Sequence, residues 1–78
     1  MKTMTCRQLG GACDQQFQAD SFEQMGELSK NHAMEMFGQG DKAHLEAGEK
    51  MKQLMQDSSA MQQWFESKRK EFEELPDD

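Results

Sequence analysis

Aromatic residues, proline and cysteine are scarce in this sequence, and long apolar runs are absent. The chain has no tyrosine, one tryptophan, one proline and two cysteines. No apolar run approaches the ~18 residues of a transmembrane helix, and the first residues lack the apolar segment of a secretory signal. We therefore expect a cytoplasmic protein that contacts no membrane and keeps both cysteines reduced.

Positive charge is also in short supply. Nine basic residues stand against fifteen acidic ones, which gives a net charge of −6, and the acidic excess is spread over both halves of the chain. The one basic run, Lys68–Lys70, is flanked by glutamates, a pattern typical of a solvated helix face with paired charges. Nucleic-acid binding needs a concentrated positive surface. The composition therefore argues against a nucleic-acid partner.

Motifs of the common enzyme classes are missing as well. The chain has no phosphate-binding loop, zinc-protease histidine pair, nucleophile elbow or dinucleotide-binding fingerprint. Gly10 and Gly11 precede a predicted strand rather than a helix, so they lack the context of a phosphate site. With so small a core, the chain has little room for a buried active-site pocket of ~300 Å³ or more. We expect a protein that is not an enzyme and has no catalytic residues.

Length and periodicity together predict a single small α+β domain over residues 1–78. A chain of 78 residues buries only about 60% of the surface that its unfolded form exposes. We therefore expect residues 1–38, a β-hairpin with one helix, to share a core with residues 39–78, which form two further helices.

The predicted hairpin rests on two alternating segments. Residues 2–6 and 13–18 alternate between apolar and polar side chains, as half-buried strands do. Residues 7–12 between them contain two glycines that can turn the chain. The inner face of this hairpin is expected to carry Met4, Cys6, Cys13 and Phe17.

Three amphipathic helices are predicted to follow. The first helix starts with a capping box at residues 20–21 and ends at Gly38. The second spans about residues 42–56 and is capped by Asp41. The third starts at residues 57–59 and ends at the proline. The last two helices should form an antiparallel hairpin. Residues at helical spacing should face the core, namely Phe22, Met25, Leu28, His32 and Met36, then Ala43, Ala47, Met51, Leu54 and Met55, then Met61, Trp64, Phe65, Phe72 and Leu75.

Cys6, Cys13 and His32 form the sharpest candidate site. The predicted hairpin places both sulfurs on its inner face, and the stripe of the first helix places the imidazole against that face. Zinc prefers four nitrogen or sulfur ligands in a tetrahedron. The fourth ligand is open between His44, Asp14 and Met36, and His44 is otherwise expected to be a partly exposed polar residue. Two alternatives remain: an inert buried cluster, and a redox-active thiol pair.

The methionines and the aromatic residues of the third helix support a second hypothesis. Eight methionines could suggest copper(I), but most lie on predicted core stripes, where methionine commonly fills irregular space. Trp64 and Phe65 diverge by about 100° around the helix, so one of them could reach the surface beside Met61. We therefore predict a module that binds a protein partner or a second copy of itself through Met61, Trp64 and Phe65, with zinc binding as the alternative.

Three stretches within residues 1–38 carry a recognisable pattern. They are the opening Met-Lys-Thr-Met-Thr-Cys-Arg-Gln-Leu-Gly-Gly-Ala-Cys, the start of the first helix at Ser21-Phe22-Glu23, and His32-Ala33 with Gly38. This pattern resembles a family of short bacterial and archaeal proteins catalogued as a domain of unknown function, whose members contain Cys-Arg-Asp-x-Gly-x-x-Cys and then His-Ala-x-x-x-His-Gly.

The resemblance implies a hairpin and a helix that carry two cysteines and two histidines, a plausible set of zinc ligands. It implies no activity, substrate or partner. Cys6, Cys13 and His32 match that set. Phe37 stands where the family has its second histidine, and Gln8 replaces the family's aspartate.

Overall fold

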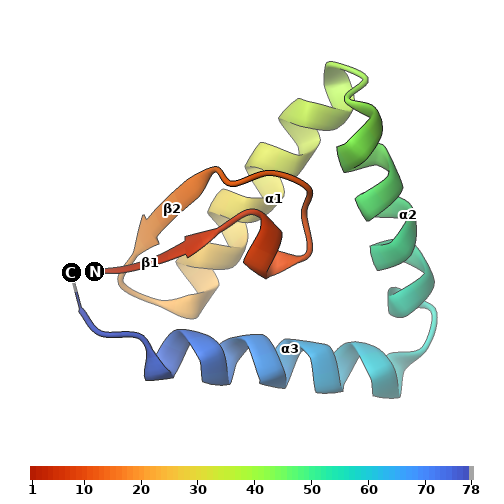
Figure 1. Ribbon diagram of the computed structural model, residues 1–78. Helices are drawn as coiled ribbons and strands as arrows, with labels where there is room; N and C mark the ends of the chain where they lie inside the picture. Colours follow the sequence, from red (N-terminus) through yellow and green to blue (C-terminus); the bar gives the residue numbers. More distant parts are fainter. Residues whose placement is uncertain (78) are drawn as a thin grey trace.

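The computed structural model describes residues 1–77 and shows an α+β fold, as the sequence predicts (Figure 1). A two-stranded antiparallel hairpin is followed by three helices. No helix of the described part is both long and apolar enough to cross a membrane. The elements in chain order are strand β1 (Lys2–Thr5), the 3₁₀ helix η1 (Arg7–Leu9), strand β2 (Gln16–Ala19), and the helices α1 (Phe22–Gly38), α2 (Lys42–Met55) and α3 (Ser58–Glu74).

The three helices form the sides of a triangle, with η1 inside it and the hairpin packed against α1 (Figure 1). The molecule is accordingly flat, with extents of 33 × 29 × 15 Å. A short turn at residues 56–57 joins α2 to α3, and from this turn the two helices diverge along two sides of the triangle. The helical hairpin expected from the sequence is therefore wide open rather than tightly packed.

The hairpin is shorter than predicted. Met4 pairs with Phe17 and Lys2 with Ala19, so the inward side chains of the strands belong to Met4, Phe17 and Ala19. The expectation that Cys6 and Cys13 belong to the strands is wrong, because both lie in the connection between β1 and β2. The carbonyl of Cys6 accepts hydrogen bonds from the N–H groups of Leu9 and Gly11, which turns the chain into η1 directly after β1.

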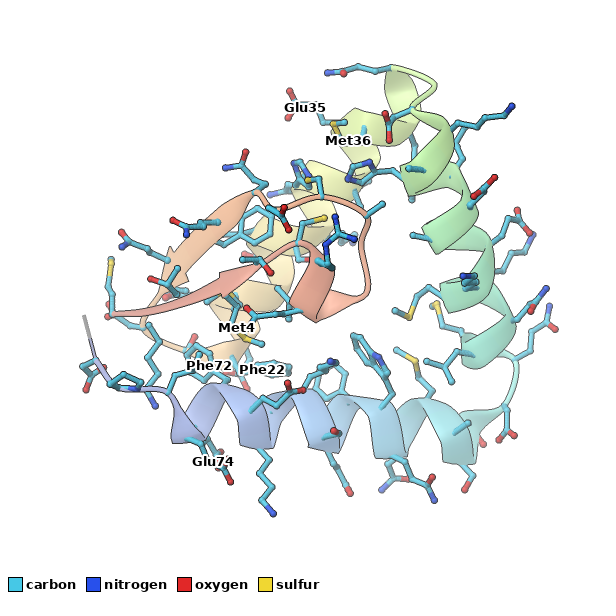
Figure 2. The ribbon with its side chains drawn as sticks, viewed as in Figure 1. Met4, Phe22, Glu35, Met36, Phe72 and Glu74 are labelled. Carbon is cyan, nitrogen blue, oxygen red and sulfur yellow. The ribbon has the colours of Figure 1, made fainter. Side chains whose placement is uncertain are left out.

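The core lies where the hairpin meets the start of α1 and the end of α3 (Figure 2). Phe22 of α1 packs against Phe72 of α3 with ring centroids 5.9 Å apart, beneath Met4 of β1. Eight apolar residues of the described part of the chain are buried, and α2 contributes none of them: Met4, Cys6, Leu9, Phe17, Ala19, Phe22, Met25 and Phe72.

Several residues of the predicted core stripes are not buried. Leu28 is 39% exposed and Met55 is 61% exposed. Within α2 the one buried residue is His44, while Ala47, Met51 and Leu54 are half-buried. For α2 the reason is the triangular arrangement, because Ala47 and Met51 border the space between the three helices, and α2 meets α1 at contacts such as that of Gly48 with the Phe37 ring.

The helix ends follow the predicted capping chemistry with small shifts. Ser21 accepts a hydrogen bond from the N–H of Gln24 at the start of α1, and Asp41 caps α2 as expected. Asp57 caps α3 by accepting hydrogen bonds from two backbone N–H groups. Gly40, with a φ of +73°, takes a left-handed conformation just after the end of α1.

Candidate metal centre

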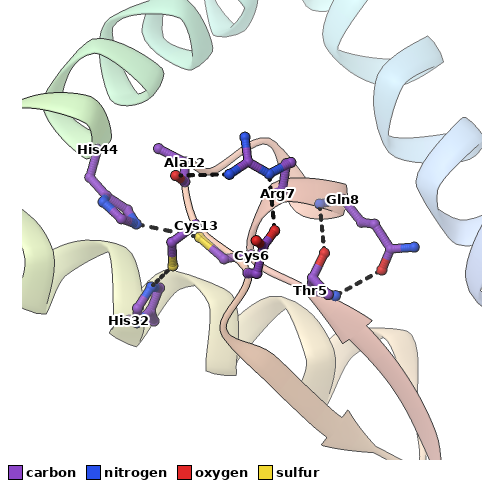
Figure 3. A network of polar contacts seen from close by, with 9 residues as sticks. Thr5, Cys6, Arg7, Gln8, Ala12, Cys13, His32 and His44 are labelled. Carbon is purple, nitrogen blue, oxygen red and sulfur yellow. Dashed lines mark hydrogen bonds and ion pairs between the residues drawn. The ribbon is translucent and has the colours of Figure 1, made fainter.

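Two cysteines and two histidines converge beside the loop of the hairpin (Figure 3). One ligand atom from each of Cys6, Cys13, His32 and His44 lies within 4.8 Å of all the others. The Cys13 Sγ is 3.2 Å from the Nε2 of His32, and the Cys6 Sγ is 3.6 Å from the Nε2 of His44. In a tetrahedral zinc site, bonds of ~2.0–2.3 Å place neighbouring ligand atoms about 3.3–3.8 Å apart. The two contacts at 3.2 and 3.6 Å are thus close to the spacing of a tetrahedral Cys₂His₂ site, and the other pairs of ligand atoms lie within 4.8 Å.

Three separate parts of the fold supply these side chains. Cys6 and Cys13 come from the two ends of the loop that contains η1, His32 from the middle of α1, and His44 from the first turn of α2. The structure thus brings together the three residues singled out in the sequence and adds His44 to them. The two sulfurs meet because the loop closes on itself, not because they face each other across a strand pair.

Backbone hydrogen bonds hold the two cysteines in place. The N–H of Cys6 donates to the carbonyl of Gln15 at 2.8 Å, and the N–H of Arg7 donates to the carbonyl of Cys13 at 2.9 Å. Gly11 passes so close to Cys6 that a Cβ at this position would lie 2.1 Å from the Cys6 Sγ. Only glycine leaves room for the sulfur here, so Gly11 is part of the site.

Side-chain contacts close the outer part of the same loop. The Arg7 guanidinium donates to the Asp14 carboxylate at 3.1 Å and to the carbonyl of Ala12 at 3.5 Å. Gln8 accepts from the N–H of Thr5, and the Thr5 hydroxyl accepts from the N–H of Gln8. Asp14, one of the candidates for the fourth ligand, is therefore an exposed ion-pair partner of Arg7.

His44 occupies the fourth position and is buried, with 3% of its surface exposed. The expectation of a partly exposed polar residue is wrong, because the cap at Asp41 directs the first turn of α2 toward the loop. The Asp41 carboxylate accepts hydrogen bonds from both the backbone N–H and the ring Nδ1–H of His44. This fixes the tautomer, so the Nε2 lone pair points toward the cysteines. Metal-bound histidines usually have such a carboxylate partner.

The surroundings change the acidity of three members of the cluster. Burial raises the pKa of the Cys6 thiol. Burial also opposes ionisation of Cys13, but hydrogen bonds from the Gln15 backbone and from both histidines outweigh it and lower the pKa of Cys13 to about 7. The hydrogen bond to Asp41 raises the pKa of His44. A thiolate at Cys13 is therefore accessible at neutral pH, and a metal would displace the proton of the Cys6 thiol.

Aromatic contacts orient the imidazole of His32. Its ring lies edge-on to Phe17 with centroids 5.5 Å apart and edge-on to His44 with centroids 5.3 Å apart.

Phe37, which stands where the resembling family has a histidine, instead packs its ring against the bare Cα of Gly48 on α2. The second imidazole of the site is that of His44, which lies on α2.

The sequence contained one signal that could have favoured His44 over Asp14 and Met36 as the fourth ligand. Asp41 and His44 have the spacing of an N-cap residue and the third residue of its helix, where the side chains of both can meet. The other predicted functional residues, Met61, Trp64 and Phe65, lie on α3 and line an apolar cavity that borders the site at Cys6. In comparisons with known proteins, the chain matches no family model, no curated protein and no solved structure.

Proposed function

We propose that this protein is a small structural zinc-binding protein in which Cys6, Cys13, His32 and His44 hold one Zn²⁺. The observation that carries this proposal is the convergence of four nitrogen and sulfur ligand atoms within 4.8 Å of one another. Four protein ligands complete a tetrahedron and leave no position for substrate, which is the pattern of structural rather than catalytic zinc. The Asp41 carboxylate behind His44 supports the same conclusion.

The zinc ion would attach α2 to the rest of the fold. His44 is the one buried residue of α2, and it is also the one residue of that helix in the cluster. The other three ligands belong to the loop and to α1, which are already joined to the core. Zinc binding free energy in such sites is folding free energy. We therefore assign the metal the role of joining α2 to the rest of the fold, which buried apolar contacts of α2 would otherwise do.

The ligand chemistry favours zinc over the other candidates. Two thiolates and two imidazoles in a tetrahedron suit Zn²⁺. Copper(I) would draw on thioethers, but the two fully buried methionines, Met4 and Met25, pack in the apolar core. A redox-active pair of Cys6 and Cys13 would require both sulfurs to be free, whereas zinc would occupy them.

Native mass spectrometry of the protein purified from ordinary medium tests this proposal. We expect one zinc per chain and two reduced thiols. The Cys13→Ser variant should lose the zinc, and the matched control Asp14→Asn, one residue away in the same loop, should retain it. A reduced wild-type protein without metal would overturn the proposal.

The predicted partner-binding or self-associating role of Met61, Trp64 and Phe65 stays a prediction. The same mass spectrum reports the oligomeric state and so tests it independently of the metal. The position of these three residues around a cavity leads to a different inference about what they bind.

A further inference from the structure

A cavity of about 530 Å³ lies between the three helices and borders the metal centre at Cys6. Cys6, Leu9, Gly10 and Gly11 line one side of it, and residues of α1, α2 and α3 line the rest. This volume lies in the range of ~300–1,000 Å³ that is typical of small-molecule sites. The sequence predicted little room for a buried active-site pocket; the cavity found here is instead partly open, and Phe37, Met55 and Phe65 on its wall are 38–61% exposed.

The walls of this cavity are overwhelmingly apolar. The large side chains come from all three helices: Phe22 and Phe37, then Met51, then Met61, Trp64 and Phe65. The bare backbone of Gly26 also lines it, and a Cβ built on this residue would meet nothing within 4 Å. Flexible methionines beside aromatic rings make a surface that adapts to an apolar chain.

The charged side chains that line the cavity are both lysines, Lys30 on α1 and Lys52 on α2. Among the described residues 1–77, no acidic side chain lines it, although the chain has fifteen acidic residues and a net charge of −6. Within residues 1–77 neither Lys30 nor Lys52 forms an ion pair, whereas Lys68 and Arg69 on α3 are both paired with glutamates. An apolar cavity that carries two unpaired lysines is chemically complementary to an apolar molecule with an anionic end.

We propose that the cavity binds an amphipathic carboxylate, such as a medium-chain fatty acid. The hydrocarbon chain lies among Met51, Met61 and Trp64, and the carboxylate pairs with Lys30 or Lys52. The cavity stays open because α2 is held at its start by the metal centre and α3 is held at its far end by Phe72. A small molecule suits this space because its volume and its lining by all three helices are those of a small-molecule pocket rather than of a flat interface.

The fluorescence of Trp64 tests this proposal, because Trp64 is the one tryptophan of the chain and lines the cavity. The zinc-loaded full chain is titrated with decanoate, decanol and decylamine, which share one hydrocarbon chain and differ in charge. We expect a saturable change with decanoate, roughly tenfold weaker binding of decanol because a charge-assisted contact is lost, and the weakest binding for decylamine.

Paired lysine variants separate the head-group contact from general charge. The double variant Lys30→Gln/Lys52→Gln should bind decanoate no more tightly than decanol. The matched double variant Lys42→Gln/Lys70→Gln removes two lysines that do not line the cavity and should keep the wild-type preference. An equal effect of both double variants would overturn the proposed carboxylate contact.

Two further results would overturn the binding site itself. One is the absence of any saturable response to decanoate. The other is a dimer, shown by sedimentation, in which Trp64 is shielded and unresponsive, because a second copy would then fill the space. Zinc content is measured on the same samples, so a failed zinc proposal is recognised separately from an empty cavity.

Discussion

Removal of zinc should release α2 while the hairpin core persists. The basis is the unequal anchoring of the helices: α1 contributes Phe22 and Met25 to the core and α3 contributes Phe72, but α2 contributes only His44 at the metal centre. Without the ion, His44 is held by its bond to Asp41 on the same helix and by its contact with Cys6. Neither is a substitute for close apolar packing.

The size of the effect follows from linkage. A domain of 78 residues has a free energy of unfolding of about 4–12 kcal/mol at ~0.05–0.15 kcal/mol per residue. Zinc present at about 1,000 times its dissociation constant adds about 4 kcal/mol. At ~4–8 °C of melting temperature per kcal/mol for a domain of this size, chelation should lower the Tm by about 16–32 °C.

Circular dichroism melts with and without a chelator measure this shift, and hydrogen exchange locates it. The His44→Ala variant should melt near the chelated wild type and should not respond to zinc. The control Gln53→Ala, an exposed change on the same helix, should keep the zinc response. After chelation, the amides of α2 should lose protection before those of β1 and β2. A Tm shift below about 4 °C, or equal loss of protection in all helices, would refute this reasoning.

Three further predictions concern individual residues of the site. Gly11→Ala should weaken zinc binding strongly in a metal-competition titration, because the new Cβ meets the Cys6 sulfur. The control Gly26→Ala, whose Cβ meets nothing, should keep the zinc affinity and raise helix stability by up to ~1 kcal/mol. Equal zinc affinities of the two variants would contradict this prediction. Asp41→Asn should weaken zinc binding by about 10–100-fold while leaving the helix cap intact, since asparagine caps as well as aspartate; an unchanged affinity would show that the carboxylate is not needed. In the metal-free protein, Cys13 should be alkylated faster than Cys6 at pH 7, because the pKa of Cys13 is lowered to about 7 whereas burial raises that of Cys6. The rate at Cys13 should fall as the pH drops below its pKa, and mass mapping that finds Cys6 faster would refute the assignment.

The local features of this fold were determined by the sequence alone. The alternation around Met4 and Phe17, the caps at Ser21 and Asp41, and the helical periodicity all depend on neighbours a few residues apart. Interactions of this range are set by backbone geometry and by the next turn of the same element. They could be predicted because no distant part of the chain competes with them.

Only the tertiary structure decided how those elements meet. The contact between Cys6 and His44 spans 38 residues of sequence, and it depends on the angle between helices joined by short turns, which no local pattern specifies. That angle brings the fourth ligand from α2 to the loop and buries His44. It also opens the cavity between the three helices. Side chains at helical spacing, which could have packed on a neighbouring helix, line this cavity instead.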